Sequence, residues 1–245
     1  MKYWNAVLRI THGCTPVNGG CSFCWSAVEA HMRQFNPLVA KQYRGLTENR
    51  HIIPQFNGTV RVHPENIIKA MKHGKPHIWQ IWNDLFHEVV PESIFHEVVS
   101  LARFKPRDTF ICLTKRPERM RRFCNQIMMP KNLFIGVSVS CQQDATTPLI
   151  EIMNTDAPSK LISFEPAIGA VDFKPYLDDT TIKVIIAGGE TGPRAHIRDC
   201  PQDAIWQCKN QCEDVGVMFF FKGWGDRRGG RSLGGREYNQ LPWVL

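Results

Sequence analysis

Seven short apolar runs alternate with helical segments along the chain, and this alternation constrains the fold more than any other feature. The runs span 6–10, 77–82, 109–114, 133–139, 160–164, 182–187 and 217–221. Several are too apolar to have a solvated face, as expected for parallel strands covered by helices. The segments with helical spacing that begin near a proline or a polar cap are 64–72, 91–103, 116–126 and 201–214. Units of this size predict an α/β fold with a parallel sheet, as a complete or partial (β/α) barrel.

Length and composition favour one soluble enzyme domain, residues 1–245. With 43% hydrophobic content the chain can bury a full core, and it has no apolar run long enough to cross a membrane. The net charge of +7 favours an anionic partner, of which nucleic acid is the obvious one. Basic residues gather in two stretches, which are either contacts for such a partner or solvated faces. These residues are Lys115, Arg116, Arg119, Arg121 and Arg122, then Lys222, Arg227, Arg228, Arg231 and Arg236.

Three cysteines, Cys14, Cys21 and Cys24, lie in a loop directly after the first apolar run. The loop contains Pro16, Gly19 and Gly20, so it can turn and fold its thiols around one centre. Three cysteines can hold a [4Fe-4S] cubane and leave one iron open to a non-protein ligand, whereas clusters that only carry electrons take four. The open iron suits S-adenosylmethionine, which chelates through its amino and carboxylate groups. We therefore predict that these cysteines hold an iron–sulfur cluster and that S-adenosylmethionine is the second cofactor.

Other uses of the nine cysteines are open at this stage. Cys112, Cys124 and Cys141 fit small buried hydrophobic residues, a role that the triplet itself can also fill. A zinc site is the stronger alternative for the triplet, with a distant fourth ligand. The candidates for that ligand are His12, Cys200, Cys208 and Cys212. Disulfides are disfavoured, because the number of cysteines is odd and the chain opens without a signal-peptide apolar stretch, which predicts a reducing cytoplasm.

Polar residues follow nearly every apolar run. In parallel α/β folds the carboxyl ends of the strands face the active site, so these side chains should converge. Each alone can be a helix cap or an ion pair, but charged groups crowded together need a ligand or mutual pairing. The set comprises Asn83, Asp84, Thr114, Lys115, Arg116, Ser138, Ser140, Glu165, Glu190 and Lys222. Within it we predict Lys115, Glu190 and Lys222 as catalytic residues.

An ordered series of motifs resembles a known family. The segments are NDLFHE at 83–88, LTKRPERM at 113–120, GVSV at 136–139, SFEP at 163–166, GGETGP at 188–193 and FFFKGWG at 219–225. They resemble the phage-associated three-cysteine-motif family, which is similar to radical SAM enzymes, and the resemblance spans almost the whole chain. The common radical SAM signature has three residues between its first two cysteines, and this chain has six. It keeps two residues between the second and third, including the aromatic Phe23.

The resemblance implies roles for the residues at the predicted strand ends. Radical SAM enzymes often hold the methionine amino group with a Gly-Gly-Glu motif after the second strand, but here that motif comes much later, at 188–190. By position, Asn83 and Asp84 fit that task, and Lys115 or Arg116 fits the methionine carboxylate through a charge-assisted contact. Ribose contacts are expected from Ser138, Ser140 and Glu165.

The resemblance also implies a substrate. Related phage proteins are associated with thymidine hypermodification, in which an amino acid attached to 5-hydroxymethyluracil is rearranged in DNA. The expected function is therefore isomerisation of an amino-acid-modified thymidine in phage DNA, in the host cytoplasm, with an external electron donor such as flavodoxin. A base inside a duplex requires flipping, and Trp25, Trp82 and Trp224 are candidate stacking residues if they are not core. The alternatives are radical SAM chemistry on RNA, a peptide or a small molecule, and a zinc-stabilised nucleic-acid-binding module.

Overall fold

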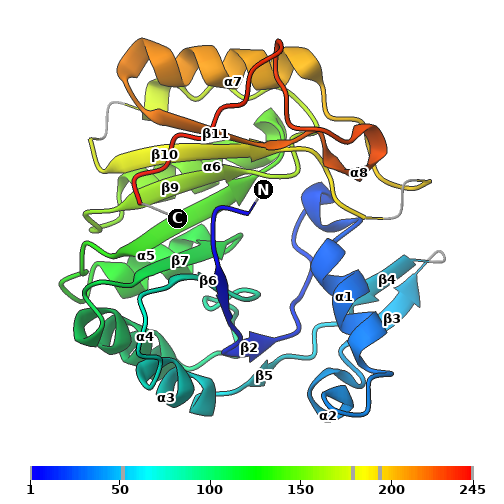
Figure 1. The fold of residues 1–245 in the computed structure, drawn as a ribbon, viewed down its shortest axis with the longest axis vertical. Helices are drawn as coiled ribbons and strands as arrows, with labels where there is room; N and C mark the ends of the chain where they lie inside the picture. Colours follow the sequence, from blue (N-terminus) through cyan, green and yellow to red (C-terminus); the bar gives the residue numbers. More distant parts are fainter. Residues whose placement is uncertain (1, 51–52, 178–179, 193–194, 244–245) are drawn as a thin grey trace.

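One curved sheet of seven parallel strands forms the body of the protein (Figure 1). This computed structural model describes residues 2–50, 53–177, 180–192 and 195–243. The sheet contains β1 (Ala6–Leu8), β6 (Ile78–Ile81), β7 (Thr109–Thr114), β8 (Leu133–Val139), β9 (Lys160–Phe164), β10 (Ile182–Gly188) and β11 (Met218–Gly223). The strands are paired in this order, with β1 and β11 at the two edges, so the sheet curls into an open half-barrel. The predicted parallel α/β fold is confirmed in its partial-barrel form, and each predicted run is a strand of this sheet.

Helices connect the strands and cover the outer face of the sheet (Figure 1). Four are the predicted ones: α3 (Glu65–Met71), α4 (Glu92–Phe104), α5 (Pro117–Cys124) and α7 (Gln202–Val215). The sequence did not predict α6 (Gln142–Met153), which begins with polar residues and contains Pro148. Its start is fixed by Asp144, whose Oδ1 accepts hydrogen bonds from the amides of Ser140 (2.8 Å) and Cys141 (3.1 Å). Between β9 and β10, the described residues form only a short 3-10 turn, η2 (Lys174–Tyr176).

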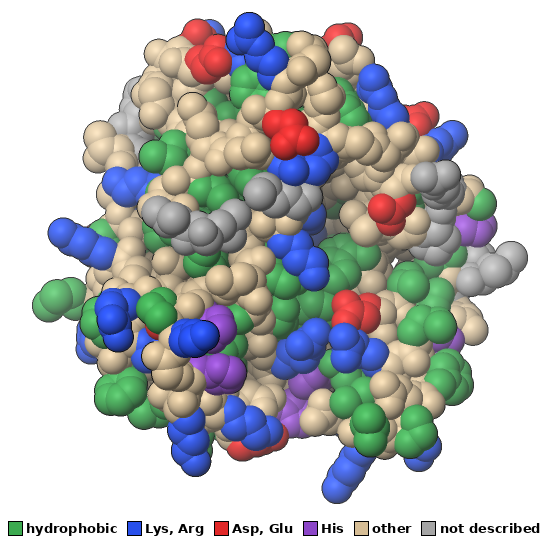
Figure 2. All heavy atoms as spheres, in the orientation of Figure 1, with side chains coloured by type: hydrophobic (Ala, Val, Ile, Leu, Met, Phe, Trp, Pro, Cys, Tyr) green, Lys and Arg blue, Asp and Glu red, His purple; other side chains and the backbone are tan. Residues whose placement is uncertain are grey.

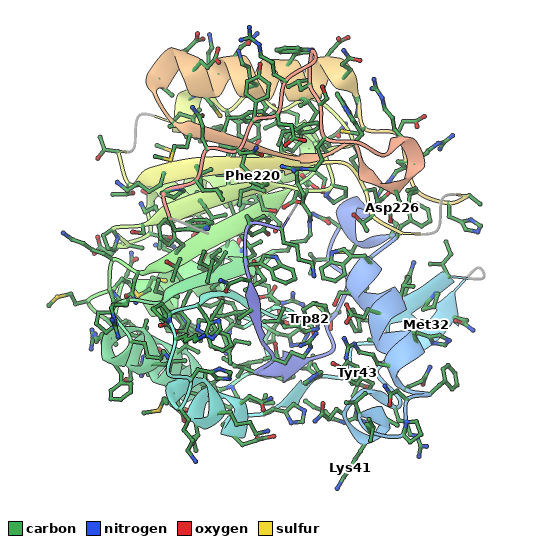
Figure 3. All side chains as sticks on the ribbon, in the orientation of Figure 1. Met32, Lys41, Tyr43, Trp82, Phe220 and Asp226 are labelled. Carbon is green, nitrogen blue, oxygen red and sulfur yellow. The ribbon has the colours of Figure 1, made fainter. Side chains whose placement is uncertain are left out.

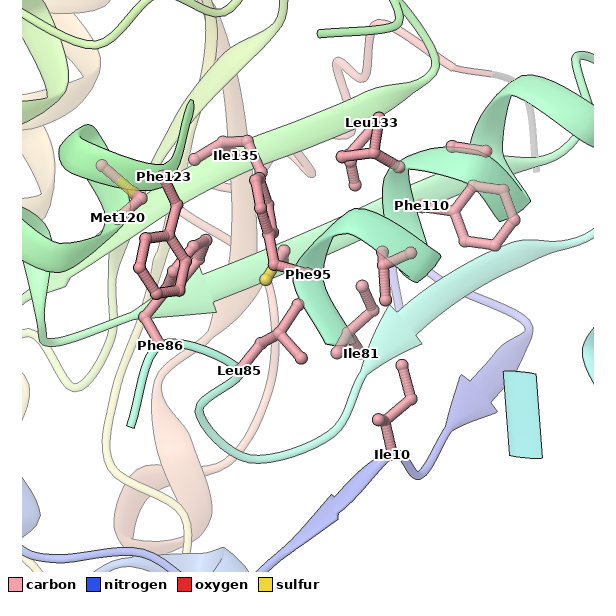
Figure 4. Close-up of a cluster of buried hydrophobic side chains, with 14 of the residues drawn as sticks. Ile10, Ile81, Leu85, Phe86, Phe95, Phe110, Met120, Phe123, Leu133 and Ile135 are labelled. Atoms are coloured by element: carbon pink, nitrogen blue, oxygen red, sulfur yellow. The ribbon is translucent and has the colours of Figure 1, made fainter. Parts of the chain in front are cut away.

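The outer-face core forms where the amphipathic helices meet the sheet (Figure 4). Phe95 of α4 packs against Phe86 and Phe123, with ring centroids 5.2 and 5.8 Å apart. Cys112 and Cys124 are buried in this core, which confirms their prediction as small hydrophobic residues. Cys141 is different: it is half-buried and forms the N-cap of α6, so the prediction of a simple core residue is wrong for it.

The inner face of the sheet is apolar near the amino ends of the strands and polar near their carboxyl ends. Its apolar part contains Ile78, Ile111, Phe134, Val184 and Phe220, the last labelled in Figure 3, and it is covered by Tyr3 and Trp243. Two or four residues further along most of these strands, the same face carries polar side chains. They are Gln80 on β6, Lys115 after β7, Ser138 on β8, Ser163 and Glu165 on and after β9, and Lys222 on β11. The half-barrel therefore presents a polar interior at the carboxyl ends of its strands.

An inserted lobe separates β1 from β6 (Figure 1). Its elements are β2 (Thr11–His12), η1 (Gly19–Cys21), α1 (Trp25–Arg33), α2 (Ala40–Tyr43), β3 (Thr47–Arg50), β4 (Ile53–Phe56) and β5 (Arg61–Val62). The lobe has a small core of its own, which contains Tyr43, Leu46 and Phe56, and Cys14 and Cys24 pack against it. After β11 the chain forms one more short helix, α8 (Gly225–Arg228). In the described part of the chain, every helix is too short or too polar to reach across a lipid bilayer.

Candidate functional site

The three cysteines lie in a loop, residues 13–24, that crosses the carboxyl edge of the sheet. We call it the cysteine loop. Arg116, after β7, donates from Nη2 to the carbonyl oxygen of Thr15 at 3.2 Å. Asn18 donates from Nδ2 to Oδ2 of Asp144 on α6 at 2.9 Å, and Arg198 donates from Nη1 to the carbonyl oxygen of Gly19 at 2.9 Å. Segments that follow β7, β8 and β10 therefore fasten the loop over the strand ends.

The three thiols are half-buried and close enough to affect one another's ionisation. Burial raises the pKa of Cys14 to about 12, with Asp84 adding to the shift and Arg116 opposing it. Burial also raises the pKa of Cys24, which is the N-cap residue of α1. Among the described residues, no three His, Cys, Asp or Glu side chains are arranged as metal ligands. In this arrangement Cys14 and Cys24 are protonated, and a metal would have to displace their protons on binding.

The distant ligands proposed for a zinc site lie apart from the thiols or are otherwise engaged. Cys208 and Cys212 are buried in the outer-face core beneath α7, and Cys200 packs against the same cluster. His12 is closer along the chain, but its Nε2 lies 3.2 Å from the hydroxyl of Tyr43. Burial, together with nearby cations, lowers the pKa of His12 to about 3. The three distant cysteines thus belong to a hydrophobic core, and His12 lies against Tyr43.

Asp84 and Arg116 form a buried ion pair at the ends of β6 and β7, with Oδ2 and Nη1 3.0 Å apart. Oδ1 of Asp84 also accepts hydrogen bonds from the Thr114 hydroxyl (2.7 Å) and the Phe86 amide (3.0 Å). Arg116 donates from Nε to Glu88 at 2.8 Å. Burial lowers the pKa of Arg116, but the neighbouring acids outweigh it and the net pKa is raised. Both predicted cofactor residues therefore satisfy their charges within the protein, and Arg116 links the pair to the cysteine loop.

Replacing Asp84 by asparagine should lower the free energy of unfolding by about 2 kcal/mol, because it leaves a buried arginine without its main counter-charge. The loss should be smaller than the ~3–5 kcal/mol typical of broken buried pairs, since Glu88 still neutralises Arg116. Urea denaturation measures this effect. Glu97→Gln, on the exposed face of α4, is the control and should change stability by less than about 0.5 kcal/mol. Equal stability of the two variants would contradict a stabilising role for the pair.

Glu190, predicted to be catalytic, holds an arginine. Its buried carboxylate accepts hydrogen bonds from the amide and Nε of Arg198 at 2.8 and 3.0 Å, and it forms an ion pair with Nη2 of the same side chain. The Arg198 guanidinium lies 5.3 Å from the ring centroid of Phe23 and also binds the cysteine loop. Sequence reasoning missed Arg198, which lies in a loop without a recognisable motif. Pro193 and Arg194, in the same stretch, lie outside the described residues.

Glu165 and Lys222 form a second ion pair, with Oε1 and Nζ 2.6 Å apart, across the inner face of β10. The Ser163 hydroxyl donates to the other carboxylate oxygen at 3.2 Å. Gly188 makes this approach possible, since a Cβ there would lie 3.2 Å from Cβ of Lys222 and 3.3 Å from Oε1 of Glu165. The Lys222 side chain is 36% exposed, so the pair faces the open interior of the half-barrel. Burial, then Glu165, raises the pKa of the nearby Tyr3.

Within the described part of the chain, three buried polar atoms near the strand ends have no hydrogen-bond partner: Nζ of Lys115, Oγ of Ser140 and Oδ1 of Asn83. The Asn83 backbone is left-handed, with φ of 57°, and its Nδ2 donates to the Ser26 hydroxyl at 3.1 Å. Buried polar atoms are costly unless they are bonded, and such a strained backbone is frequent at functional sites. Asn83, Lys115 and Ser140 thus keep unused hydrogen-bonding capacity, in contrast to Asp84 and Arg116. Ser138 is half-buried on β8.

Gly20 places the cysteine loop directly above two of these groups, Ser140 and Lys115. A Cβ on Gly20 would lie 2.2 Å from Oγ of Ser140 and 3.1 Å from Nζ of Lys115. The neighbouring Gly19 differs, since a Cβ there would meet only Nη1 of Arg198, at 4.0 Å. Residue 20 therefore has to be a glycine for the loop to lie this close to β7 and β8, and Ser140 and Lys115 lie directly against the thiol-bearing loop.

The three tryptophans proposed as stacking residues have different environments. Trp82, labelled in Figure 3, is buried and meets Trp25 edge to face at 4.9 Å, while Trp25 itself is 42% exposed. Trp224 is buried, donates from Nε1 to the carbonyl oxygen of Ser232 at 2.9 Å and lies under Arg228. Of the three, Trp25 presents an open ring surface, and Trp82 and Trp224 are core residues.

Fold and site together define a class: parallel α/β half-barrel proteins with a cysteine loop over the carboxyl ends of the strands. The chain belongs to the DUF5131 family, described as proteins of unknown function, whose profile matches residues 1–242. Comparison with curated proteins gave no match, and comparison with solved structures gave none either.

Proposed function

We propose that this protein is an iron–sulfur enzyme that binds S-adenosylmethionine and uses it for radical chemistry. The observation that carries the proposal is the position of three thiols in one loop directly above a buried amine and a buried hydroxyl that have no protein partner. When bound, a cubane on three cysteines supplies an electron to S-adenosylmethionine and starts the radical reaction. The donor set fits such a group, since thiols are the usual ligands of iron–sulfur clusters and a cofactor explains the unpaired atoms.

Cys14, Cys21 and Cys24 are the proposed cluster ligands. Thiolates, not thiols, bind metal, so the site needs help in losing its protons. Arg116 supplies part of that help, because its Nη1 lies 3.9 Å from Sγ of Cys14 and opposes the rise of the Cys14 pKa. Arg116 is itself held in place by Asp84. We therefore assign Asp84 and Arg116 to positioning the cysteine loop rather than to direct contact with S-adenosylmethionine.

The unpaired groups define how S-adenosylmethionine is held in this proposal. Lys115 Nζ binds the carboxylate of its methionine part, and Oδ1 of Asn83 accepts a hydrogen bond from its amino group. Ser140 and Ser138 supply hydroxyls to the rest of the cofactor. Glu165 and Lys222 face the interior beyond them, where a proton shared by Glu165 Oε1 and Lys222 Nζ can be held next to a substrate.

Substitution of the two adjacent glycines tests whether the cofactor binds beneath the cysteine loop. Gly20→Ala should weaken binding of S-adenosylmethionine by about tenfold or more, because its Cβ would overlap Oγ of Ser140 and push the loop away from Ser140 and Lys115. Gly19→Ala should bind the cofactor normally, since its Cβ would meet no atom closer than 4.0 Å. Isothermal titration of the anaerobic proteins measures both affinities. Equal affinities would contradict a cofactor pocket beneath Gly20.

Reductive cleavage of S-adenosylmethionine tests the proposed function. The anaerobically prepared protein is mixed with a chemical reductant or reduced flavodoxin, and release of methionine is followed by chromatography. We expect methionine release that requires the protein, the reductant and iron. A protein loaded with iron that binds S-adenosylmethionine but never cleaves it would overturn the proposal.

For the substrate, we propose an amino-acid-modified thymidine in DNA, which the enzyme isomerises. The net charge of +7 and the exposed ring of Trp25 support a nucleic-acid substrate. Lys and Arg side chains are spread over the face seen in Figure 2. Arg227 and Arg231 from the C-terminal basic stretch are engaged with Asp199 at 3.0 Å and with Asn239 at 2.6 Å. The phosphate contacts must therefore come mainly from other basic side chains.

Nucleoside analysis tests this substrate. DNA that carries the amino-acid-modified thymidine is incubated with the reduced enzyme, digested and examined by mass spectrometry coupled to chromatography. An isomerase should yield a nucleoside of unchanged mass and altered retention time. If the nucleosides are unchanged although the enzyme cleaves S-adenosylmethionine, the substrate is not this DNA but RNA, a peptide or a small molecule.

A further inference from the structure

A cavity opens at the amino ends of the strands, at the end of the half-barrel opposite the cysteine loop. Its volume is about 690 Å³, which lies within the range of small-molecule sites. The first residues of β6 and β7, Ile78 and Thr109, line it, whereas the cysteine loop lies over the carboxyl ends of the same strands. The proposed cofactor site therefore does not use this cavity.

The charge around this cavity has one sign. Arg107, Lys131 and Lys183 line it, and no Asp or Glu is found among the described residues of its lining. The side chains of Arg107 and Lys131 are exposed and form no hydrogen bond or ion pair within the described part of the chain. Lys183 donates from Nζ to the carbonyl oxygen of Thr180 at 2.7 Å. Two cations are thus available to an anion that enters the cavity.

Three neutral polar residues of the lining are already engaged. Oδ1 of Asn5 accepts a hydrogen bond from the amide of Ile78 at 2.9 Å. Asn132 donates from Nδ2 to the carbonyl oxygen of Asp108 at 2.9 Å, and the Ser159 hydroxyl donates to the carbonyl oxygen of Lys131 at 2.7 Å. These contacts tie the starts of the strands together. They make this part of the wall rigid, so the chemistry offered to a ligand comes from the cations, the apolar surface and the polar residues His77 and Thr109.

The apolar surface of the cavity is aromatic. Phe134 and Trp243 meet edge to face with ring centroids 4.7 Å apart, and both line the cavity together with Ile78. Trp243 is fixed by a hydrogen bond from its Nε1 to the carbonyl oxygen of Tyr3 at 2.9 Å. Both rings are otherwise buried, so they present only their edges to the cavity. These edges beside two available cations match a ligand that carries a phosphate and a flat ring.

We propose that this cavity binds a nucleotide, with Arg107 and Lys131 holding its phosphate and the base in contact with the edges of Phe134 and Trp243. Arginine can bind a phosphate through two parallel hydrogen bonds, and lysine adds a point charge. The nucleotide is either free in solution or the phosphorylated end of a nucleic acid strand, since both present the same chemistry. This nucleotide-binding proposal does not depend on whether the protein binds an iron–sulfur cluster.

Calorimetric titration with ADP tests the site. The Arg107→Gln/Lys131→Gln protein should bind ADP about tenfold or more weakly than the unmodified protein, as expected from the loss of charge-assisted contacts. Lys41→Gln/Arg44→Gln removes the same charge from exposed positions on the inserted lobe and should leave the affinity unchanged. Matching thermal unfolding curves exclude misfolding as the cause. Failure of the unmodified protein to bind ADP, or equal weakening in both double variants, would overturn the proposal.

Two further experiments identify the ligand and distinguish this cavity from the proposed S-adenosylmethionine site. The first compares ADP with a 5′-phosphorylated oligonucleotide and its 5′-hydroxyl counterpart. If the phosphorylated strand binds more tightly than ADP and the hydroxyl strand does not bind, the ligand is a strand end. If ADP binds more tightly, the ligand is a free nucleotide. Lys115→Met removes a group of the proposed S-adenosylmethionine pocket and should leave ADP affinity unchanged. Loss of ADP binding in that variant would assign the nucleotide to the other site and overturn the proposal.

Discussion

Replacing Lys115 by methionine should stabilise the metal-free protein and at the same time weaken its binding of S-adenosylmethionine by about 10- to 150-fold. The Nζ atom of Lys115 is buried without a partner, and an unsatisfied buried polar group costs about 1 to 3 kcal/mol. Methionine keeps much of the side chain's length and removes that cost. The binding loss corresponds to one charge-assisted hydrogen bond, worth about 1.5 to 3 kcal/mol. Urea denaturation and isothermal titration measure the two effects on the same samples.

The opposite signs of these effects distinguish a ligand-binding lysine from a structural one. A lysine that supported the fold would lose stability on substitution. Lys160→Met is the matched control: this lysine is also buried, and its Nζ donates to the carbonyl oxygen of Met153 at 3.2 Å. It should lose stability and keep normal cofactor affinity. A Lys115→Met protein that is less stable and binds S-adenosylmethionine normally would refute the assigned role.

Loss of any one cysteine of the triplet should abolish cluster assembly and cleavage of S-adenosylmethionine. Because the proposed cluster has three protein ligands, Cys14→Ala, Cys21→Ala and Cys24→Ala should each leave less than about a tenth of the iron bound. Iron and sulfide analysis after anaerobic reconstitution, followed by methionine release, measures both steps.

Cys112→Ala and Cys141→Ala are the controls for the triplet. Cys112 lies in the outer-face core and Cys141 at the start of α6, so both should keep their iron. Cys112→Ala should lose some stability through a small cavity. Full iron content in the Cys14→Ala protein would remove Cys14 from the ligand set. Loss of iron in Cys141→Ala alone would point to a different ligand set.

The strands were predictable because each is a continuous apolar run, and a run covered on both sides is hard to mistake. The bounds of β7 (Thr109–Thr114) and β8 (Leu133–Val139) match the prediction residue for residue. The helix α6 was missed because its polar start and Pro148 hide the buried positions Ala145, Leu149 and Ile152. The inserted lobe was missed for a related reason. Its short elements are held by a few side chains around Tyr43 and Leu46 rather than by a periodic pattern.

The polar residues at the strand ends were predictable as a group, but their partners were not. From sequence position alone, Asp84, Lys115 and Arg116 are equally good candidates for binding the cofactor. The structure separates them, since Asp84 and Arg116 neutralise each other and Lys115 remains unpaired. Pairing between distant residues depends on how far the half-barrel closes and on where the cysteine loop lies. Arg198 illustrates the same limit, because its contacts to Gly19 and Glu190 join segments that no local pattern connects.

The central claim, an iron–sulfur cluster held by Cys14, Cys21 and Cys24, is tested most directly by the metal content of the anaerobically purified and reconstituted protein. Elemental analysis and sulfide determination should find about four iron atoms and about four sulfides per chain, with little zinc. A colourless protein that carries about one zinc atom per chain and takes up no iron would contradict the claim and favour a zinc-stabilised binding module.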